Sequence, residues 1–281
     1  MRVLVTGGTG HLGTRIVSEL HRDGHEVCVL ARRPRTDPDV DWVVGDLSTG
    51  DGIPDAVAGV DAIVHAATNS PAAQRGRFKL RDFVSSPADV DVDGTKALLA
   101  AAQTAGVKQF VHVSIVGLEA VKALPYARRK LAAEQLVRDA RLPWSIVRAT
   151  GFYWLLARMF ADMVKRPMIA LPAHALMAPV DSDEFARFVV DGVTGGAHGE
   201  RDDFAGPQTS AMTELMAQYL AARGLDRRIR HAPLPRRIQA AITAGNTAAD
   251  GRRGTITWAQ WLERSVPVPA HDRGGAANRT S

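Results

Sequence analysis

The sequence predicts an α/β protein with a doubly wound parallel sheet and a smaller C-terminal lobe. Three observations support this fold class. The chain opens with a short apolar, β-branched run, then a glycine-rich turn, then an amphipathic segment. Strand and helix patterns alternate from there to about residue 148, which is typical of parallel strands joined by helical crossovers. After residue 150 this alternation ends, and prolines, glycines and aromatic residues become more frequent.

The apolar runs of the first half predict six strands. They are Val3–Val5, Val27–Leu30, Trp42–Val44, Ala62–Val64, Phe110–Val113 and Trp144–Val147. Helices are expected between them, since apolar residues recur on one face of three segments: the segment after Gly10, Asp91–Ala105 and Tyr126–Ala140. Ligands of such sheets bind beyond the carboxyl ends of the strands, where the strand order reverses. Site residues are therefore expected just after the strands.

The turn after the first strand has the spacing of a dinucleotide-binding loop, Gly7-x-x-Gly10-x-x-Gly13. Gly7 allows a tight turn, Gly10 lets backbone N–H groups approach a pyrophosphate, and Gly13 lets the helix pack closely. The positive end of that helix then faces the diphosphate. A plain strand–turn–helix is the alternative interpretation. The cofactor-binding residues predicted here are Gly7, Thr9, Gly10, His11, Leu12 and Gly13.

These patterns divide the chain into a dinucleotide-binding domain at 1–150, a smaller substrate-binding lobe at 151–266 and a flexible tail at 267–281. The tail is rich in Pro, Gly, Ala and Asn, a composition typical of frayed termini. Helical patterns in the lobe fall at Asp181–Val193, Thr213–Arg223 and Trp258–Arg264.

The composition favours a cytoplasmic protein that binds neither nucleic acid nor membranes. Hydrophobic residues make up 46% of the 281 residues, which is enough for a core, and no run is long enough to span a bilayer. No signal peptide is visible, and the single cysteine, Cys28, lies in an apolar run, as expected for a buried thiol in a reducing compartment. The net charge is +5, but the arginine clusters carry no nucleic-acid-reading motif. No Cys/His cluster has metal-site spacing, so no metal is expected.

The residues after the second strand favour NADP(H) over NAD(H). In NAD-binding folds an acidic residue there holds the ribose hydroxyls, whereas an arginine accommodates the 2′-phosphate of NADP. This chain has Arg32 and Arg33 at that place and no acid. A planar guanidinium pairs well with phosphate oxygens and stacks on adenine. We expect Arg32 to be the main contact and Arg33 its support; two solvated arginines are the alternative, and NAD(H) stays possible.

Further cofactor contacts are expected after the third and fourth strands. Asp46 and Leu47 are placed to bracket the adenine, with the carboxylate accepting from its amino group; a turn carboxylate is the alternative for Asp46. His65 is expected to be a packed histidine at a strand end. The small residues that would let the cofactor lie against the backbone are Ala66, Ala67 and Thr68.

Ser114, Tyr126 and Lys130 form the candidate catalytic set. Ser114 ends the fifth strand, Tyr126 follows Pro125 at a helix start, and Lys130 lies one turn further on the same helix face. A lysine cation favours phenolate and is expected to lower the pKa of tyrosine from about 10. Tyr126 would exchange a proton with a carbonyl oxygen while hydride is transferred, Ser114 would hold that oxygen, and Lys130 would also hold the nicotinamide ribose. Taken singly, each residue also fits an ordinary structural role.

With these motifs, the chain resembles the short-chain dehydrogenase/reductase superfamily in its atypical or extended branch, in the style of NmrA-like and azoreductase-like NAD(P)-binding proteins. The resemblance implies a Rossmann fold and the same catalytic set, Ser114, Tyr126 and Lys130. It also implies that Ala149, Thr150, Gly151 and Phe152 run beside the nicotinamide. The segments that carry it include TGGTGHLG (6–13), LARRP (30–34), VKQFVHVS (107–114), PYARRKLAAEQLV (125–137) and WSIVRATGFY (144–153).

Two positions depart from the pattern of that superfamily. Asp91 stands where extended members often have asparagine, and Ala149 stands where they tend to have proline after Arg148. Many NmrA-like relatives lack the tyrosine and act as cofactor sensors, whereas this chain keeps Tyr126, which favours catalysis.

The sequence therefore predicts an NADP(H)-dependent oxidoreductase that transfers hydride to or from a small, mostly apolar carbonyl, quinone or similar acceptor. Apolar residues at 152–163 and 168–177 are candidates for an apolar or aromatic substrate pocket, although most are expected to be ordinary core. A non-catalytic, NADP(H)-sensing protein of the NmrA type is the alternative. A nucleotide-sugar epimerase or dehydratase ranks lower, because only Arg158, Lys165 and Arg166 are candidates to grip a second diphosphate. The oligomeric state is left open.

Overall fold

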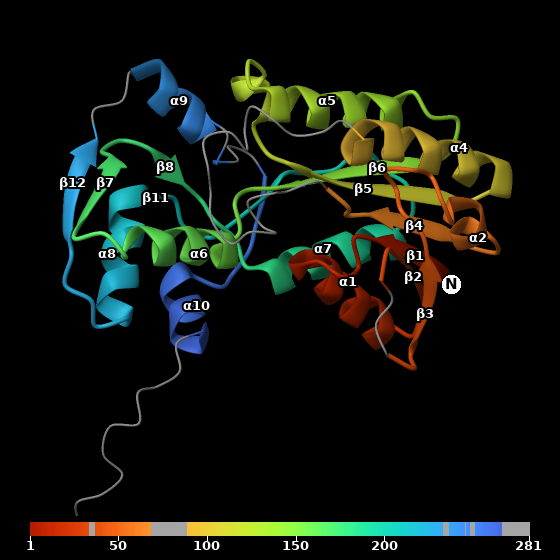
Figure 1. Ribbon diagram of the computed structural model, residues 1–281, viewed down its shortest axis with the longest axis horizontal. Helices are drawn as coiled ribbons and strands as arrows, with labels where there is room; N and C mark the ends of the chain where they lie inside the picture. Colours follow the sequence, from red (N-terminus) through yellow and green to blue (C-terminus); the bar gives the residue numbers. More distant parts are fainter. Residues whose placement is uncertain (34–36, 69–88, 233–235, 245, 248–250, 266–281) are drawn as a thin grey trace, which may run out of the picture.

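The computed structural model describes residues 1–33, 37–68, 89–232, 236–244, 246–247 and 251–265. It confirms the predicted α/β class, with a central parallel sheet in the order β13-β10-β6-β5-β4-β1-β2-β3 and β9 also paired to β6 (Figure 1). The strand order reverses between β1 and β4, so their carboxyl ends border the expected crevice. The strands are β1 (Arg2–Thr6), β2 (Glu26–Ala31), β3 (Val40–Val44), β4 (Ala62–His65), β5 (Gln109–Ile115), β6 (Trp144–Ala149), β9 (Gly199–Glu200), β10 (Phe204–Ala205) and β13 (Arg252–Arg253).

Helices cover both faces of the sheet (Figure 1). One face carries α1 (His11–Arg22) and α7 (Ser182–Thr194), and the other carries α2 (Ile53–Val57), α4 (Thr95–Ala105) and α5 (Pro125–Arg138). Two separate cores result. Val3 and Val5 belong to the core with α1 and α7, whereas Leu4 belongs to the core with α2, α4 and α5, as the alternation of side chains along a strand requires. Cys28 is buried with a free thiol in the second core, as expected.

Most of the other described elements form a smaller lobe with a core of its own. The lobe contains α6 (Tyr153–Met163), β7 (Met168–Pro172), β8 (Leu176–Met177), β11 (Ser210–Ala211), α8 (Met212–Ala222), β12 (Arg228–Ala232), α9 (Arg236–Ala244) and α10 (Trp258–Ser265). Part of the predicted second domain nevertheless lies in the first, because α7, β9, β10 and β13 all return to the central sheet. No helix in the described part of the chain is long and apolar enough to cross a bilayer.

The turn between β1 and α1 depends on a very close approach of the backbone. Gly7 has φ of +77°, and a Cβ atom there would lie 2.7 Å from the Ala67 nitrogen. A Cβ atom on Gly13 would lie 2.0 Å from the Gly7 carbonyl oxygen. Only glycine fits at either position without moving the backbone.

Two buried histidines lie side by side on the central strands β4 and β5. His65 and His112 are register partners, and their ring centroids are 5.3 Å apart. The Thr95 hydroxyl donates to the Asp91 carbonyl, so it accepts from Nε2 of His65 at 2.8 Å, and Nδ1 accepts from Thr6 at 2.7 Å. Burial lowers the pKa of His65 to about 3, with Lys130 adding to the effect. His65 is thus the packed histidine that the sequence predicts, and its low pKa keeps it neutral.

His112 differs from its neighbour in having no hydrogen-bond partner for either ring nitrogen among the described residues. Burial, followed by the charges of His65 and Lys130, lowers the pKa of His112 well below its usual value. Both imidazoles are therefore neutral in the folded protein at neutral pH.

We expect Gly13→Ala to reduce the free energy of unfolding by about 1–3 kcal/mol, because the added methyl group overlaps the Gly7 carbonyl. Urea unfolding measures this, with Ser18→Ala on the exposed side of α1 as the matched control. A Gly13→Ala protein as stable as the control would show that the turn tolerates a side chain.

We expect the free energy of unfolding to fall as the pH drops below about 6.5, because the unfolded chain then binds protons that folded His65 and His112 cannot bind. Each histidine lowers the free energy of unfolding by about 1.4 kcal/mol for every pH unit below its unfolded pKa. For His65 this loss continues down to its folded pKa of about 3. Urea unfolding at several pH values measures the slope. His112→Phe should flatten it by one histidine's share, whereas His174→Gln, at an exposed position, should not. An unchanged slope in His112→Phe contradicts this origin.

Candidate functional site

The turn Gly7–Gly13, which we call the glycine cradle, presents backbone donors at the crevice. Gly10 is the N-cap of α1, and no side chain caps that helix end. The Gly10 N–H donates to the Gly7 carbonyl at 2.9 Å, which keeps the turn tight. Uncapped N–H groups at a helix N-terminus bind phosphate groups well. The cradle therefore fits a pyrophosphate, and the glycines leave room for its oxygens at the backbone.

His11 contacts the small lobe with its side chain. Its ring stacks on Trp154 with centroids 4.2 Å apart, and Nε2 lies 3.1 Å from Oγ of Ser182. Burial and the charge of Arg15 lower the pKa of His11 to about 4, so the ring is neutral at pH 7. The first residues of α1, α6 and α7 thus meet here. Within the cradle, Leu12 packs against the core and Thr9 lies exposed.

The predicted adenosine contacts lie beyond β2 and β3. Arg32 and Arg33 follow β2 and are exposed. The Asp46 carboxylate accepts from the backbone N–H of Ser48 at 2.9 Å and from its hydroxyl at 2.8 Å, so it closes a turn. The Ser48 N–H bond is also the main cause that lowers the pKa of Asp46, with Arg32 adding to it. Leu47 packs on the core beneath α2 and α4. Roles of these residues toward a nucleotide stay predictions.

The segment after β4 links the cradle to the candidate catalytic residues. Gly7 packs against the backbone of Ala66 and Ala67. The next residue, Thr68, donates from Oγ1 to Oδ1 of Asp91 at 2.8 Å. Contacts therefore run without a break from the cradle to the carboxylate that pairs with Lys130.

Tyr126 and Lys130 lie one turn apart on α5, and Lys130 forms a buried ion pair with Asp91. The Lys130 Nζ lies 2.8 Å from Asp91 Oδ1, with side-chain exposures of only 4% and 2%. Asp91 belongs to η2 (Asp89–Gly94), a π-helical turn that leads into α4. Burial opposes the charged form of Lys130, but Asp91 and Tyr126 raise its pKa overall. Lys130 is therefore a cation with its counterion already in place.

Lys130 does not decide the direction in which the pKa of Tyr126 shifts. Burial raises the pKa of the Tyr126 phenol, Lys130 lowers it, and Asp91 raises it again, so the overall direction is upward. The prediction of a lowered tyrosine pKa was wrong, because burial disfavours phenolate and the carboxylate of Asp91 offsets part of the effect of Lys130. Tyr126 is a neutral phenol at pH 7.

In the structure Ser114 lies beside Glu134, and not beside the Lys130–Asp91 pair. Ser114 is buried on the face of β5 toward α5, and no contact in the described structure joins its hydroxyl to Tyr126. Beside it, Glu134 accepts two bonds from Arg148, at 2.8 and 2.6 Å, and one from Arg138 at 2.8 Å. Burial opposes ionisation, but these bonds and the nearby Ser114 hydroxyl hold the pKa of Glu134 below its usual value. The role of Ser114 in holding a substrate oxygen stays a prediction.

The segment after β6 passes between the sheet and the lobe. Ala149 is buried in β6, and the Thr150 hydroxyl donates to the Ala178 carbonyl at 2.5 Å. The Phe152 ring lies 5.7 Å from that of Phe185. Gly151 lies close to Asn246 and Met177, since a Cβ atom there would be 3.6 Å from Oδ1 of Asn246, an ordinary van der Waals contact.

Sequence reasoning did not assign Asp91, Glu134 or Asn246 to the site. The spacing of Tyr126, Lys130 and Glu134 along one helix face was the available signal for Glu134. Asp91 was visible only as a departure from the asparagine of the resembled pattern. Asn246 carries no local signal.

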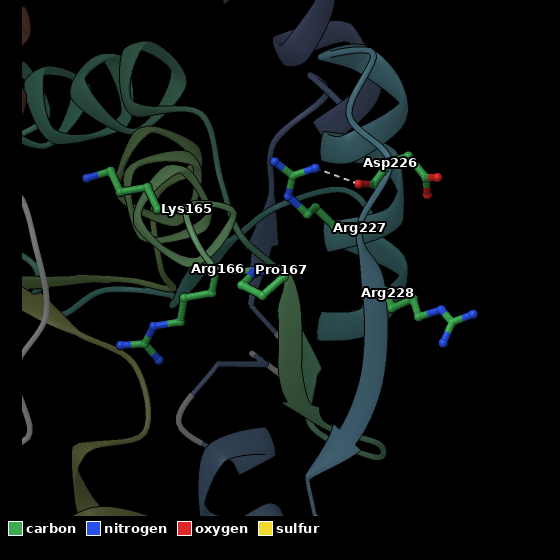
Figure 2. A pocket seen from close by; sticks show the side chains of 6 residues that line it. All are labelled: Lys165, Arg166, Pro167, Asp226, Arg227 and Arg228. Carbon is green, nitrogen blue, oxygen red and sulfur yellow. Dashed lines mark hydrogen bonds between the residues drawn. The ribbon is translucent and has the colours of Figure 1, made fainter.

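A pocket of about 450 Å³ lies in the lobe, beyond the C-terminal end of α6 (Figure 2). It is lined by Lys165, Arg166, Pro167, Asp226, Arg227 and Arg228. Figure 2 shows the side chains of Lys165, Arg166 and Arg228 pointing in different directions, and Arg227 donates to the Asp226 and Val164 carbonyls. These cations do not converge on a common ligand. The pocket is also remote from the cradle, which contacts the opposite end of α6 through Trp154.

The described residues include no group of three His, Cys, Asp or Glu side chains arranged to hold a metal ion. Among the described residues, backbone N–H donors, the Tyr126 phenol and the Lys130–Asp91 pair are candidates for chemistry at this end of the sheet.

Comparison with known proteins identifies the family of this chain. A family model described as NAD(P)H-binding matches residues 7–154. The (4-alkanoyl-5-oxo-2,5-dihydrofuran-3-yl)methyl phosphate reductase of Streptomyces griseus subsp. griseus is 32% identical over 253 residues, covering 86% of this chain and 79% of that relative. Photosystem II assembly factor Ycf39 of Trieres chinensis is 28% identical over 195 residues, covering 67% and 58%. The chain spans between 42% and 58% of the length of the first three curated relatives that it matches.

The fold has close counterparts among solved structures. The NADPH-dependent quinone oxidoreductase QOR2 of Escherichia coli, solved with NADPH, superposes with a TM-score of 0.73 at 14% identity, covering 93% of this chain and 99% of that one. Because the family model spans more than half of the sequence and the fold agrees, the chain belongs to this NAD(P)H-binding family and has a Rossmann-like fold.

Proposed function

We propose that this chain is an NADP(H)-dependent oxidoreductase that transfers hydride to or from a small, mostly apolar carbonyl, quinone or similar acceptor. One observation carries the proposal: the Lys130–Asp91 pair, one helical turn from Tyr126 on α5, lies in an unbroken line of contacts with the glycine cradle. A phosphate-binding turn and an acid–base phenol therefore border one crevice. The reductase from Streptomyces griseus, which covers most of this chain, supports the same reaction class.

Each group has a definite role in this proposal. The cradle binds the diphosphate through backbone N–H groups, and Arg32, supported by Arg33, binds the 2′-phosphate. When bound, NADP(H) supplies or accepts the hydride. Tyr126 gives its phenol proton to the substrate oxygen in reduction, or accepts a proton in oxidation. Lys130, held by Asp91, stands beside the phenol, and Ser114 is the candidate to hold the substrate oxygen.

A non-catalytic, cofactor-sensing protein is the second candidate. The similarity to Ycf39, which is named as an assembly factor, favours it. In that case the same cradle would bind the dinucleotide, and the lobe would contact a protein partner. A nucleotide-sugar epimerase is not favoured, because Lys165 and Arg166 lie at the outer turn of the lobe and point in different directions (Figure 2).

We expect Tyr126→Phe to lower the rate of carbonyl reduction on the order of 10²–10⁴-fold, because the proton donor is lost. NADPH absorbance measures the rate with a panel of aldehydes, ketones and quinones. Tyr219→Phe, which removes a phenol from the lobe core, is the matched control. A wild-type protein that binds NADPH tightly but reduces nothing supports the sensing candidate. Quinone reduction that survives Tyr126→Phe would show hydride delivery without the phenol proton.

We expect Arg32→Ala to weaken NADPH binding roughly 10–100-fold and NADH binding far less, because a charge-assisted bond to the 2′-phosphate is lost. Fluorescence titration of the purified protein with each nucleotide measures both affinities. Arg141→Ala, at an exposed arginine before β6, serves as the control. Equal losses for the two nucleotides would place the 2′-phosphate elsewhere.

A further inference from the structure

The ion pair between Lys130 and Asp91 is unusual in being almost completely buried next to a candidate acid. Both side chains are nearly inaccessible, and the two charged atoms are 2.8 Å apart. A buried charge without a partner is strongly unfavourable, so the two groups hold each other in the ionised form. Seen from Tyr126, the pair has no net charge.

The position of Asp91 is held from several sides. Asp91 lies in the π-helical turn η2, and such turns are rare and occur often at functional sites. Thr68 donates to its carboxylate at 2.8 Å, and Thr95, which also bonds His65, donates to its backbone carbonyl at 2.8 Å. The carboxylate therefore stays on Lys130.

No other charge in the described surroundings replaces the lysine as a promoter of phenolate. On the strands beneath α5, His65 and His112 are neutral. Further along α5, Glu134 is bonded to Arg138 and Arg148. Arg148 extends to Glu119 of η3 (Leu118–Val121) and Glu200 of β9, and Lys96 of α4 is exposed. Arg129 of α5 has a buried guanidinium nitrogen without a partner among the described residues, and it is not among the groups that shift the pKa of Tyr126.

We propose that Asp91 is a positioning residue that neutralises Lys130, so that Tyr126 keeps its proton at neutral pH and the site favours reduction of a ketone or aldehyde over oxidation of an alcohol. This inference rests on the proposed function and assigns its direction. In reduction the hydride goes to the carbonyl carbon, the phenol proton goes to its oxygen, and solvent returns a proton to the phenolate. Oxidation needs the phenolate at the start, and Asp91 keeps that form scarce at pH 7.

The test is a spectroscopic titration of Tyr126 that needs neither cofactor nor substrate. Phenolate absorbance is recorded against pH for the full chain. For each protein, the titration of the same protein carrying Tyr126→Phe is subtracted, which removes the absorbance of Tyr153 and Tyr219. The proteins compared are wild type, Asp91→Asn, Lys130→Met and the double variant. Asp93→Asn, an exposed carboxylate on the same turn, is the matched control.

If Asp91 neutralises Lys130, the pKa of the Tyr126 phenol should differ among the variants in a definite order. Asp91→Asn leaves a lone cation and should lower the pKa of Tyr126 by at least about one unit. Lys130→Met leaves a lone carboxylate and should raise it. The double variant, which removes both charges, should titrate like wild type, as should Asp93→Asn.

Coinciding titrations of Asp91→Asn and wild type would overturn the proposal. If Asp91→Asn does not fold, the comparison of Lys130→Met with the double variant decides, and equal pKa values there would overturn it as well. An activity measurement then separates the two proposals. In an active protein, Asp91→Asn should move the alkaline rise of alcohol oxidation to lower pH by the same amount as the phenol. The predicted phenol shifts without any turnover would support neutralisation by Asp91 and count against the oxidoreductase itself.

Discussion

The close approach between the glycine cradle and the start of the segment after β4 is the constraint on which the rest of the structure depends. Gly13 lies against the Gly7 carbonyl, and Gly7 lies against the backbone of Ala66 and Ala67. Because no side chain separates these backbones, the ends of β1 and β4 and the N-terminus of α1 lie close together. Thr68, the next residue, then reaches Asp91, and Asp91 reaches Lys130. Backbone packing thus sets the distance between the diphosphate end of the crevice and its acid–base end.

The electrostatics of the crevice follow from burial as much as from charge. A lysine one helical turn from a tyrosine is expected to promote phenolate, and in water-accessible surroundings it would. Here the lysine carries its own buried counterion, and the phenol is partly buried, so the neutral form is favoured. The neighbouring histidines are neutral for the same reason. The site as a whole combines one balanced ion pair, a neutral phenol and neutral imidazoles.

The small lobe is tied to the cradle by aromatic stacking. Trp154, in the first turn of α6, covers His11, and Ser182, the first residue of α7, bonds the same ring. α6 directly follows the segment that carries the predicted nicotinamide contacts, Thr150 and Phe152 among them. The lobe that would shape the substrate pocket is therefore anchored at the diphosphate end of the crevice, and its outer basic turn lies at the far end of α6.

The sequence by itself determined the features that depend on neighbours along the chain. Apolar runs and periodicity identified the six main strands and the helices α1, α4 and α5, though not the short α2, since a strand or helix buries residues at fixed local intervals. The glycine spacing identified the cradle, and the four-residue spacing of Tyr126 and Lys130 placed them on one helix face. Only the tertiary structure decided which distant groups meet: Asp91 with Lys130, Ser114 with Glu134, and α7, β10 and β13 with the first-half sheet. Those contacts join segments that are separated along the chain and brought together by crossovers and packing. The balance of charge at Tyr126 depends on such a contact, so no local pattern carried it.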